Sequence, residues 1–375
     1  MEIYLLHMGK TQMLQAWNNV DFDQYREILG SDFHDKIKQL YANLEAVDVD
    51  KIPEAEHSEL MEYFELIKDW VTLLHYHKAD SYPEQLVYSL NLVMREWLDN
   101  YSDFVILISD NPYSVTHPLS SIDAIYQNIE LRYGIHFNEK IVKITMPIEH
   151  CSDYLVNVSL YHEIGLHIDN QRGLRWGVFN SLLLPANNTP KFIAELQHFF
   201  PFYKYPLDDH LKNKLFRHSN EYIADLFSAQ YTGEDALVYI KYLRSHNPDV
   251  EGEEHPRPSL RYEMISAFLN TDNAFIAIIK LLIPKLYKNR TLSLDKKYDA
   301  SMADKIGSMN PVGVGSEHEL HSLYSAGWNI YKMGKAIRES NYPATQGMTQ
   351  HDLYIKLNEI IGSSISEYSK NNPFA

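Results

Sequence analysis

The sequence predicts a mainly α-helical protein with a small β-sheet, on the strength of three observations. Apolar residues recur at three- and four-residue intervals through most of the chain, which is the spacing of helices with one buried face. Two short runs, Phe104–Ile108 and Lys140–Met146, are apolar or rich in β-branched residues and are typical of strands. The chain contains no internal repeat and no low-complexity region, so we expect ordinary globular units.

The apolar spacing also predicts where the helices lie. The predicted helices are Gln12–Ile28, Asp32–Leu44, Glu54–His75, Pro83–Asn100, Ser120–Tyr133, Ser152–Asn170, Pro190–Phe199, Leu207–Tyr231, Ala236–Ser245, Ser259–Leu282, His318–Glu339 and His351–Tyr368. Three regions follow from this pattern: a helical N-terminal region (1–100), a core that holds both strands (101–290) and a helical C-terminal region (291–375).

Composition narrows the functional class. The formal net charge of −16 disfavours nucleic acid and anionic lipid as default partners. Cys151 is the only cysteine, so an intramolecular disulfide and a cysteine-rich metal site are both excluded. The longest apolar stretch, Ala274–Leu286, is interrupted by charged residues and is too short to span a bilayer. We therefore expect a cytoplasmic protein without membrane insertion; the oligomeric state is not predicted.

One segment carries a recognisable metal-binding pattern. His162 and Glu163 begin the sequence His-Glu-Ile-Gly-Leu-His, which starts like the zincin helix His-Glu-x-x-His. Leu166 stands where the second histidine would be, and the next histidine, His167, comes one residue later. On a regular helix, five residues turn the side chain by about 140°, so both histidines cannot face one metal. A π-bulge would restore the alignment, and Gly165 would lower its cost. The motif resembles the zinc helix of dipeptidyl peptidase III, in which the two histidines have the same five-residue spacing.

Three interpretations of Leu166 stay open. In the first, a bulge brings His167 to the metal and the protein is an active enzyme. In the second, the helix is regular, Leu166 faces the metal position, and the protein is an inactive scaffold that binds a partner. In the third, another side chain completes the site: His218 or Asp169, the latter seven residues after His162 on the same face.

A second helical segment carries matching acidic residues. Glu221 and Asp225 lie four residues apart, in the sequence Glu-Tyr-Ile-Ala-Asp, on one side of a predicted helix whose other side is apolar. This resembles the gluzincin peptidases, in which such a glutamate is the third zinc ligand and the aspartate orients a ligand histidine. The resemblance implies a zinc ion bound by His162, His167 and Glu221.

A third sequence element follows the helix that carries Glu221, as it does in one group of gluzincins. His255 opens the sequence His-Pro-Arg-Pro-Ser-Leu-Arg, which ends at Arg261 and resembles an element of CAAX-prenyl endopeptidases and their soluble relatives, the minigluzincins. By that resemblance His255 stabilises the oxyanion of the transition state, and Arg261 braces the loop or the helix that carries Glu221.

Together these elements predict a zincin-like core with helical additions at both ends. The expected activity is that of a zinc-dependent endopeptidase acting on a protein or peptide, with Glu163 as the general base. Tyr161 or Tyr222 would assist the oxyanion, and strand Lys140–Met146 would pair with an extended substrate. The alternative is the inactive interaction protein, because Leu166 replaces the usual histidine.

Overall fold

The computed structural model describes residues 2–77, 84–109, 119–145, 150, 153–184, 189–204, 206–236, 238, 240–241, 249–286, 292–299 and 301–373. The chain divides into two compact units. Unit 1 comprises Met1–Pro83 and Asn100–Cys151, and unit 2 comprises Glu84–Asp99 and Ser152–Ala375. Each unit therefore contains segments that are distant in the sequence.

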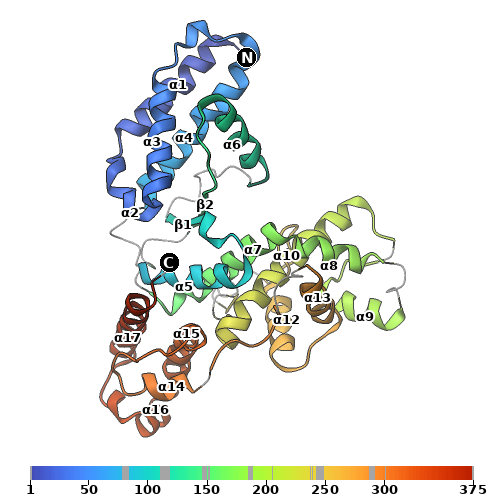
Figure 1. The fold of residues 1–375 in the computed structure, drawn as a ribbon. Coiled ribbons are helices and arrows are strands. Elements are labelled where there is room, and N and C mark those ends of the chain that lie inside the picture. Colours follow the sequence, from blue (N-terminus) through green and yellow to red (C-terminus); the bar gives the residue numbers. More distant parts are fainter. Residues whose placement is uncertain are drawn as a thin grey trace. The chain divides into compact units, whose positions relative to one another are not determined.

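Unit 1 is built on packed helices. Its helices are α1 (Ile3–Asn18), α2 (Arg26–Leu29), α3 (Ser31–Glu45), α4 (His57–His77) and α6 (Leu119–Tyr133). Helices α1, α3 and α4 lie alongside one another (Figure 1). Their core includes edge-to-face contacts of Trp70 with Phe33 and Phe137, which favour a defined packing arrangement over a loose apolar cluster.

The two predicted strands pair in unit 1. Strand β1 (Phe104–Ser109) and strand β2 (Lys140–Thr145) are parallel, with Phe104 opposite Lys140 and Ser109 opposite Thr145. Parallel strands need a crossover connection, and α6 lies between them in the sequence. The prediction of a mainly helical protein with a small sheet is confirmed; Met146, the predicted last strand residue, lies outside the described residues.

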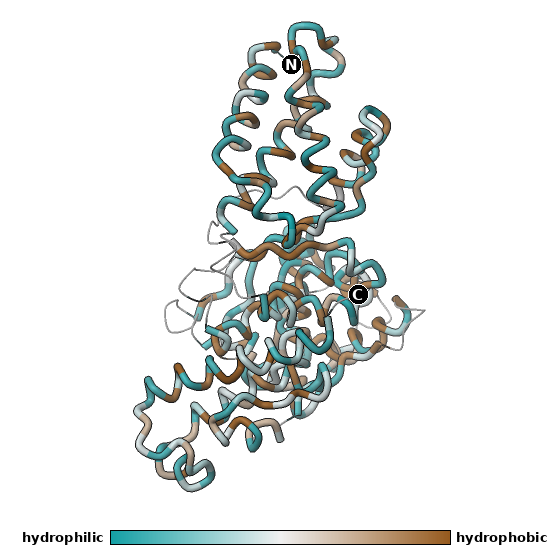
Figure 2. Tube along the Cα trace, turned by 60° about the vertical axis from the view of Figure 1, so that its left-hand side comes forward, coloured by the Kyte–Doolittle hydropathy of each residue, from teal (hydrophilic) through white to brown (hydrophobic). Residues whose placement is uncertain are grey.

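Unit 2 holds every residue of the candidate site. Its helices are α5 (Glu84–Trp97), α7 (Leu160–Arg172), α8 (Leu174–Leu182), α9 (Pro190–Phe199), α10 (Asp209–Thr232), α12 (Pro258–Asn270), α13 (Ala274–Leu286), α14 (Met302–Ile306), α15 (Glu317–Lys332), α16 (Lys335–Asn341) and α17 (Gln350–Asn371). Helix α10 is the centre of the unit and packs against α7, α8, α12 and α15. Apolar and polar residues alternate along most helices, as amphipathic packing requires (Figure 2).

The units divide the chain differently from the three predicted regions. The strands, placed in the core by sequence, belong with the N-terminal helices, whereas α5 and the C-terminal helices belong with the candidate site. The first helix also begins and ends earlier than predicted, at Ile3 and Asn18. Most of the predicted helix Ala236–Ser245 lies outside the described residues.

The predicted helix Ser259–Leu282 is two helices, α12 and α13. The chain breaks at Asp272, whose φ of 62° lies in the left-handed region that ends helices. Asn273 then caps α13, because its Oδ1 accepts the N–H of Ile276. Among the described helices, no single one is long and apolar enough to cross a membrane. Helices α12 and α13 have the required length and hydropathy only when taken together, and the pair is bent by 63°.

Candidate functional site

Three helices bring their polar side chains together inside unit 2. His162 of α7 places its Nδ1 3.0 Å from Asp225 Oδ1 on α10. Arg261 of α12 donates from Nε to Asp225 Oδ2 over 2.8 Å and from Nη2 to Asp225 Oδ1 over 2.7 Å. All three side chains are buried, so the carboxylate of Asp225 joins three helices in a setting where its hydrogen bonds are strong.

Glu221 lies one turn before Asp225 and shares its surroundings. Its Oε2 atom is 3.1 Å from His255 Nδ1, 3.2 Å from Arg261 Nη1 and 3.6 Å from His162 Nε2. Burial would raise the pKa of Glu221, but the hydrogen bond to His255 and the charge of Arg261 outweigh it and hold the pKa below its usual value. Glu221 is therefore an ionised, buried carboxylate.

The pKa of Asp225 follows the same balance. Burial would raise it, but the charge and hydrogen bonds of Arg261, with the hydrogen bond to His162, hold it below the usual range. Two buried carboxylates are thus compensated by Arg261 and by the two histidines. We call the set His162, Glu221, Asp225, His255 and Arg261 the polar cluster.

His255 reaches the polar cluster from a loop that is held along α10. This loop, residues 249–257, is called the strap below. Its three glutamates pair with bases spaced along α10: Glu251 with Lys214 over 2.6 Å, Glu253 with His210 over 3.4 Å, and Glu254 with Arg217. The imidazole of His255 remains mostly exposed, and its hydrogen bond to Glu221 raises its pKa.

Helix α7 is an unbroken α-helix from Leu160 to Arg172, so the bulge expected around Gly165 is absent. Gly165 has a different role. A Cβ atom there would lie 2.8 Å from Phe227 Cβ and 3.1 Å from Ala224 Cα, so glycine lets α7 approach α10 closely. The glycine that suggested a distorted helix instead serves a regular helix packed tightly on its neighbour.

A regular α7 separates His167 from the polar cluster. Five residues of α-helix turn the His167 side chain by about 140° from that of His162. His167 is buried, and burial lowers its pKa to about 4. Glu163, the expected general base, is exposed. Leu166 is half-buried and lies one turn after His162, on the same side of the helix.

The alternative ligands have other partners. His218 Nε2 lies 3.0 Å from the carbonyl oxygen of Gly252 in the strap. Asp169 Oδ1 accepts the backbone N–H of Arg175 over 2.7 Å and so ties the end of α7 to the start of α8. Burial raises the pKa of Asp169 to about 6. Both residues therefore have roles that hold loops and helix ends in place.

The two tyrosines considered for the oxyanion are also engaged elsewhere. The hydroxyl of Tyr161 is 2.7 Å from His321 Nδ1, inside the unit, and burial lowers the pKa of His321 to about 3. The hydroxyl of Tyr222 donates to the carbonyl oxygen of Phe199 over 2.8 Å. Both rings are fully buried, so neither hydroxyl is available to a substrate at the polar cluster.

The donor atoms fit a zinc site only in part. His162 Nε2 and Glu221 Oε2 are 3.6 Å apart, close to the separation of two ligands that each lie about 2 Å from one tetrahedral zinc ion. Within the described residues, however, no three His, Cys, Asp or Glu side chains are grouped so that they could hold a metal ion. The guanidinium of Arg261 also occupies Glu221 Oε2. The set falls one ligand short of a zincin site.

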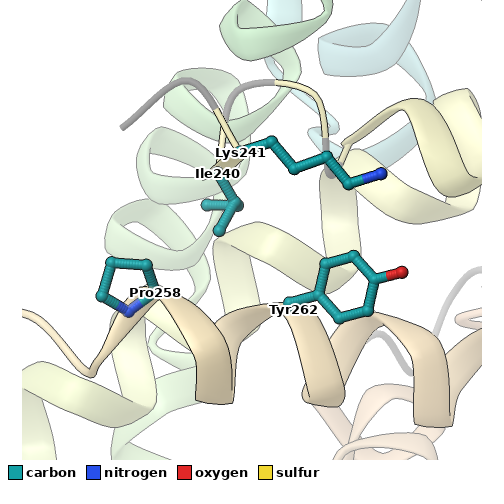
Figure 3. A pocket seen from close by; sticks show the side chains of 4 residues that line it. All are labelled: Ile240, Lys241, Pro258 and Tyr262. Carbon is teal, nitrogen blue, oxygen red and sulfur yellow. The ribbon is translucent and has the colours of Figure 1, made fainter. Parts of the chain in front are cut away.

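Sequence reasoning did not find the strap or the pocket beside α12. The strap has a signal in the sequence, since Glu251, Glu253 and Glu254 follow a helix with basic residues at helical spacing. The pocket, of about 260 Å³, is lined by Ile240, Lys241, Pro258 and Tyr262 (Figure 3). Tyr262, which lines it, directly follows Arg261 in the sequence. The pocket depends on tertiary packing, so no sequence pattern marks it.

Comparison of the chain with models of protein families, with curated proteins and with solved structures finds no match. The function must therefore be argued from the polar cluster itself.

Proposed function

We propose that this chain is a non-catalytic interaction protein on a gluzincin-like scaffold, with a protein or peptide as its partner. The observation that carries the proposal is the unbroken helix α7, in which His162 and His167 point about 140° apart. Leu166 then occupies the position from which a zincin helix supplies its second histidine. A catalytic zinc site uses three protein ligands and one open position, and the described residues around His162 and Glu221 do not group three such ligands.

The charges of the polar cluster support the same proposal. Two buried carboxylates without a metal would need other compensation, because burying an unpaired charge is costly. Arg261 supplies it directly, with contacts to both Asp225 and Glu221. His255 adds a second donor to Glu221. A cluster that is already compensated has little electrostatic demand for a divalent cation.

A zinc-dependent endopeptidase is the second candidate, favoured by the orientation of His162. Its Nδ1 is held by Asp225, which leaves Nε2 directed to the side of Glu221, as in a ligand histidine with an orienting carboxylate. Zinc held by His162, Glu221 and His167 would supply a polarised water beside Glu163. This requires α7 to acquire a π-bulge that the described helix lacks.

Zinc content separates the two candidates. We expect purified wild-type protein to carry substoichiometric zinc by elemental analysis and to show no thermal shift when zinc is added. Leu166→His places an imidazole four residues after His162, on the same helix face, and completes the ligand set with Glu221. This variant should bind one zinc ion per chain, in competition with the contact of Arg261 to Glu221, and show a measurable rise in Tm when zinc is added.

His167→Ala is the matched control, because it removes a histidine of the same helix that lies away from the polar cluster. We expect its zinc content to equal that of the wild type. Stoichiometric zinc in the wild-type protein that is lost in His167→Ala, together with a peptidase activity that is lost in Glu163→Gln, would overturn the proposal in favour of the endopeptidase.

A further inference from the structure

The first half of α10 carries a row of basic side chains. His210, Lys214 and Arg217 follow one another at intervals of four and three residues, so they lie on one side of the helix, and we call them the basic row. Each base holds one glutamate of the strap. In a chain whose net charge is −16, this row is a local surface that attracts acidic groups.

One aromatic ring positions the centre of the basic row. The ammonium of Lys214 lies over the ring of Phe202, 4.9 Å from its centroid. The imidazole of His218, one turn after Lys214 on α10, meets the same ring edge to face at a centroid distance of 5.3 Å. Phe202 belongs neither to α10 nor to the strap, so it orders both side chains independently of the strap. Side chains that are already ordered lose less freedom when a ligand binds.

The contacts at this centre fit a polypeptide. His218 is fully buried, and its Nε2 donates to the backbone carbonyl oxygen of Gly252 over 3.0 Å. Lys214 binds the carboxylate of the preceding residue, Glu251, over 2.6 Å. Adjacent residues of one segment thus supply a backbone carbonyl and a side-chain carboxylate to two neighbouring groups of α10. Nucleic acids and lipid headgroups carry no peptide carbonyl, so this surface selects an acidic peptide segment.

The strap is held loosely on either side of this centre. The side chains of Glu253 and His210 are 61% and 69% exposed, and those of Glu254 and Arg217 are 59% and 48% exposed. Exposed ion pairs contribute little to stability, and the first of these two is charged only when His210 is protonated. Residues 252–255 of the strap are themselves exposed. Opening of the strap is therefore a local event that leaves α10 intact.

We propose that the strap is an autoinhibitory segment and that an acidic segment of a partner protein takes its place on the basic row. This rests on the proposed function, which requires a protein or peptide as the partner, and it names the chemistry of that partner: carboxylate side chains on an exposed stretch of chain. The strap competes from within the same molecule, at an effective concentration on the order of millimolar, so it weakens the binding of a free partner. Its displacement also separates His255 from Glu221, which couples partner binding to the polar cluster.

A fluorescein-labelled peptide with the sequence of residues 249–257 is the probe, and its anisotropy measures binding to the full chain. The strap-neutral variant combines Glu251→Gln, Glu253→Gln and Glu254→Gln and so weakens the competing segment. We expect this variant to bind the peptide about tenfold more tightly than the wild type does, and added salt to weaken the binding. In the same background, Lys214→Glu should abolish binding, and Arg217→Glu, at an exposed position, should weaken it. A peptide with glutamine in place of its three glutamates should not bind.

The matched control combines Glu27→Gln, Glu62→Gln and Glu367→Gln, which changes three exposed glutamates outside the strap. It alters the net charge by the same amount and should bind the peptide like the wild type. Equal tightening in both triple variants would overturn the proposal, because net charge would then govern binding. So would a strap-neutral variant that keeps the wild-type circular dichroism spectrum and binds the peptide no more tightly than the wild type does.

Two further outcomes would replace the acidic partner. A single-stranded oligonucleotide of matching charge that binds the strap-neutral variant more tightly than the peptide does would overturn the choice of a polypeptide. A wild-type dimer in sedimentation velocity that the strap-neutral variant loses would also overturn it, since the strap of a second copy would then be the occupant. Zinc content tests the proposed function separately, so failure of peptide binding and failure of that function are distinguishable.

Discussion

His162 and Asp225 are in contact across 63 residues of sequence, with His162 Nδ1 3.0 Å from Asp225 Oδ1. Asp225 also accepts two hydrogen bonds from Arg261, whose Nη2 lies 3.4 Å from the same imidazole nitrogen. The carboxylate is ionised and can only accept hydrogen bonds, so Nδ1 of His162 carries the proton and donates to it. One buried carboxylate thus determines the orientation of both the imidazole and the guanidinium.

Asp225→Ala should be among the most destabilising single substitutions in unit 2. It leaves the guanidinium of Arg261 buried with one fewer anionic partner and removes the acceptor of His162. Breaking a buried ion pair costs about 3–5 kcal/mol, so we expect a loss of that size in the free energy of unfolding, measured by urea titration. Asp209→Ala, in the exposed first turn of the same helix, is the control and should change stability by about 0.5 kcal/mol or less. Equal effects of the two variants would contradict the assignment.

Gly165→Ala tests the close approach of α7 to α10. The added methyl group would lie 2.8 Å from Phe227 Cβ and 3.1 Å from backbone Ala224 Cα, so the helices must separate. We expect a loss of about 1–3 kcal/mol, as for other overpacked cores. Gly177→Ala is the matched control, because its methyl group meets Leu282 at an ordinary 3.5 Å. It should stabilise α8 by about 0.5–1 kcal/mol through helix propensity. A stabilising Gly165→Ala would show that α7 does not pack as described.

His167 and Asp169 should give opposite pH dependences within one helix. The pKa of His167 is lowered to about 4 in the folded protein, so its unfolded form binds more protons and its contribution to stability increases as pH rises from 4 to 6.5. The pKa of Asp169 is raised to about 6, so its folded form binds more protons and its contribution decreases as pH rises from 4 to 6.

The two effects largely cancel in the wild-type protein, and single variants expose them. Relative to the wild type, His167→Gln should lose stability as pH rises from 4 to 6.5, and Asp169→Asn should gain it, each by up to about 3 kcal/mol. The measurement is the free energy of unfolding in urea at pH 4, 5, 6 and 7. Parallel pH profiles for the three proteins would mean that the two side chains are not buried as described.

Many of the helices and both strands could be predicted because each is encoded largely by its own residues, whereas α8 and α14 were not predicted and α12 and α13 were predicted as one helix. Helix α9 was predicted from Pro190 to Phe199, where it lies, since Thr189 caps it and proline opens it. The family resemblance implied that Asp225 orients a ligand histidine and that Arg261 braces the loop or the helix that carries Glu221. The structure places His162, Asp225 and Arg261 in contact. Local periodicity could show only that Glu221 and Asp225 share a helix face.

The bulge in α7 could not be judged from the sequence, because a glycine between two histidines has two physical meanings. It permits a distorted backbone, and it also permits the close approach of another helix. The choice depends on Ala224 and Phe227, which are about 60 residues away in the sequence and come next to Gly165 only in the folded protein. The strap escaped prediction for a similar reason, since its ion pairs join residues about 40 positions apart.

The strap should come away from α10 when its most buried ion pair is reversed. Lys214 and Glu251 are 2.6 Å apart with side chains only 11% and 15% exposed, and the Lys214 ammonium also lies over the ring of Phe202. Lys214→Glu replaces this attraction with repulsion between two carboxylates that are largely shielded from solvent. We expect amide hydrogen exchange within residues 249–257 to become at least tenfold faster, equivalent to about 1.4 kcal/mol of lost local stability.

Lys212→Glu is the control, since Lys212 lies on the same helix and pairs with the local Asp209 three residues away. It should leave exchange in the strap unchanged while altering the net charge by the same amount. Exchange that quickens equally in both variants would mean that net charge, and not the Lys214–Glu251 pair, governs the loop. If only Lys214→Glu releases the strap, His255 is held beside Glu221 by contacts made one to two helical turns away, along α10.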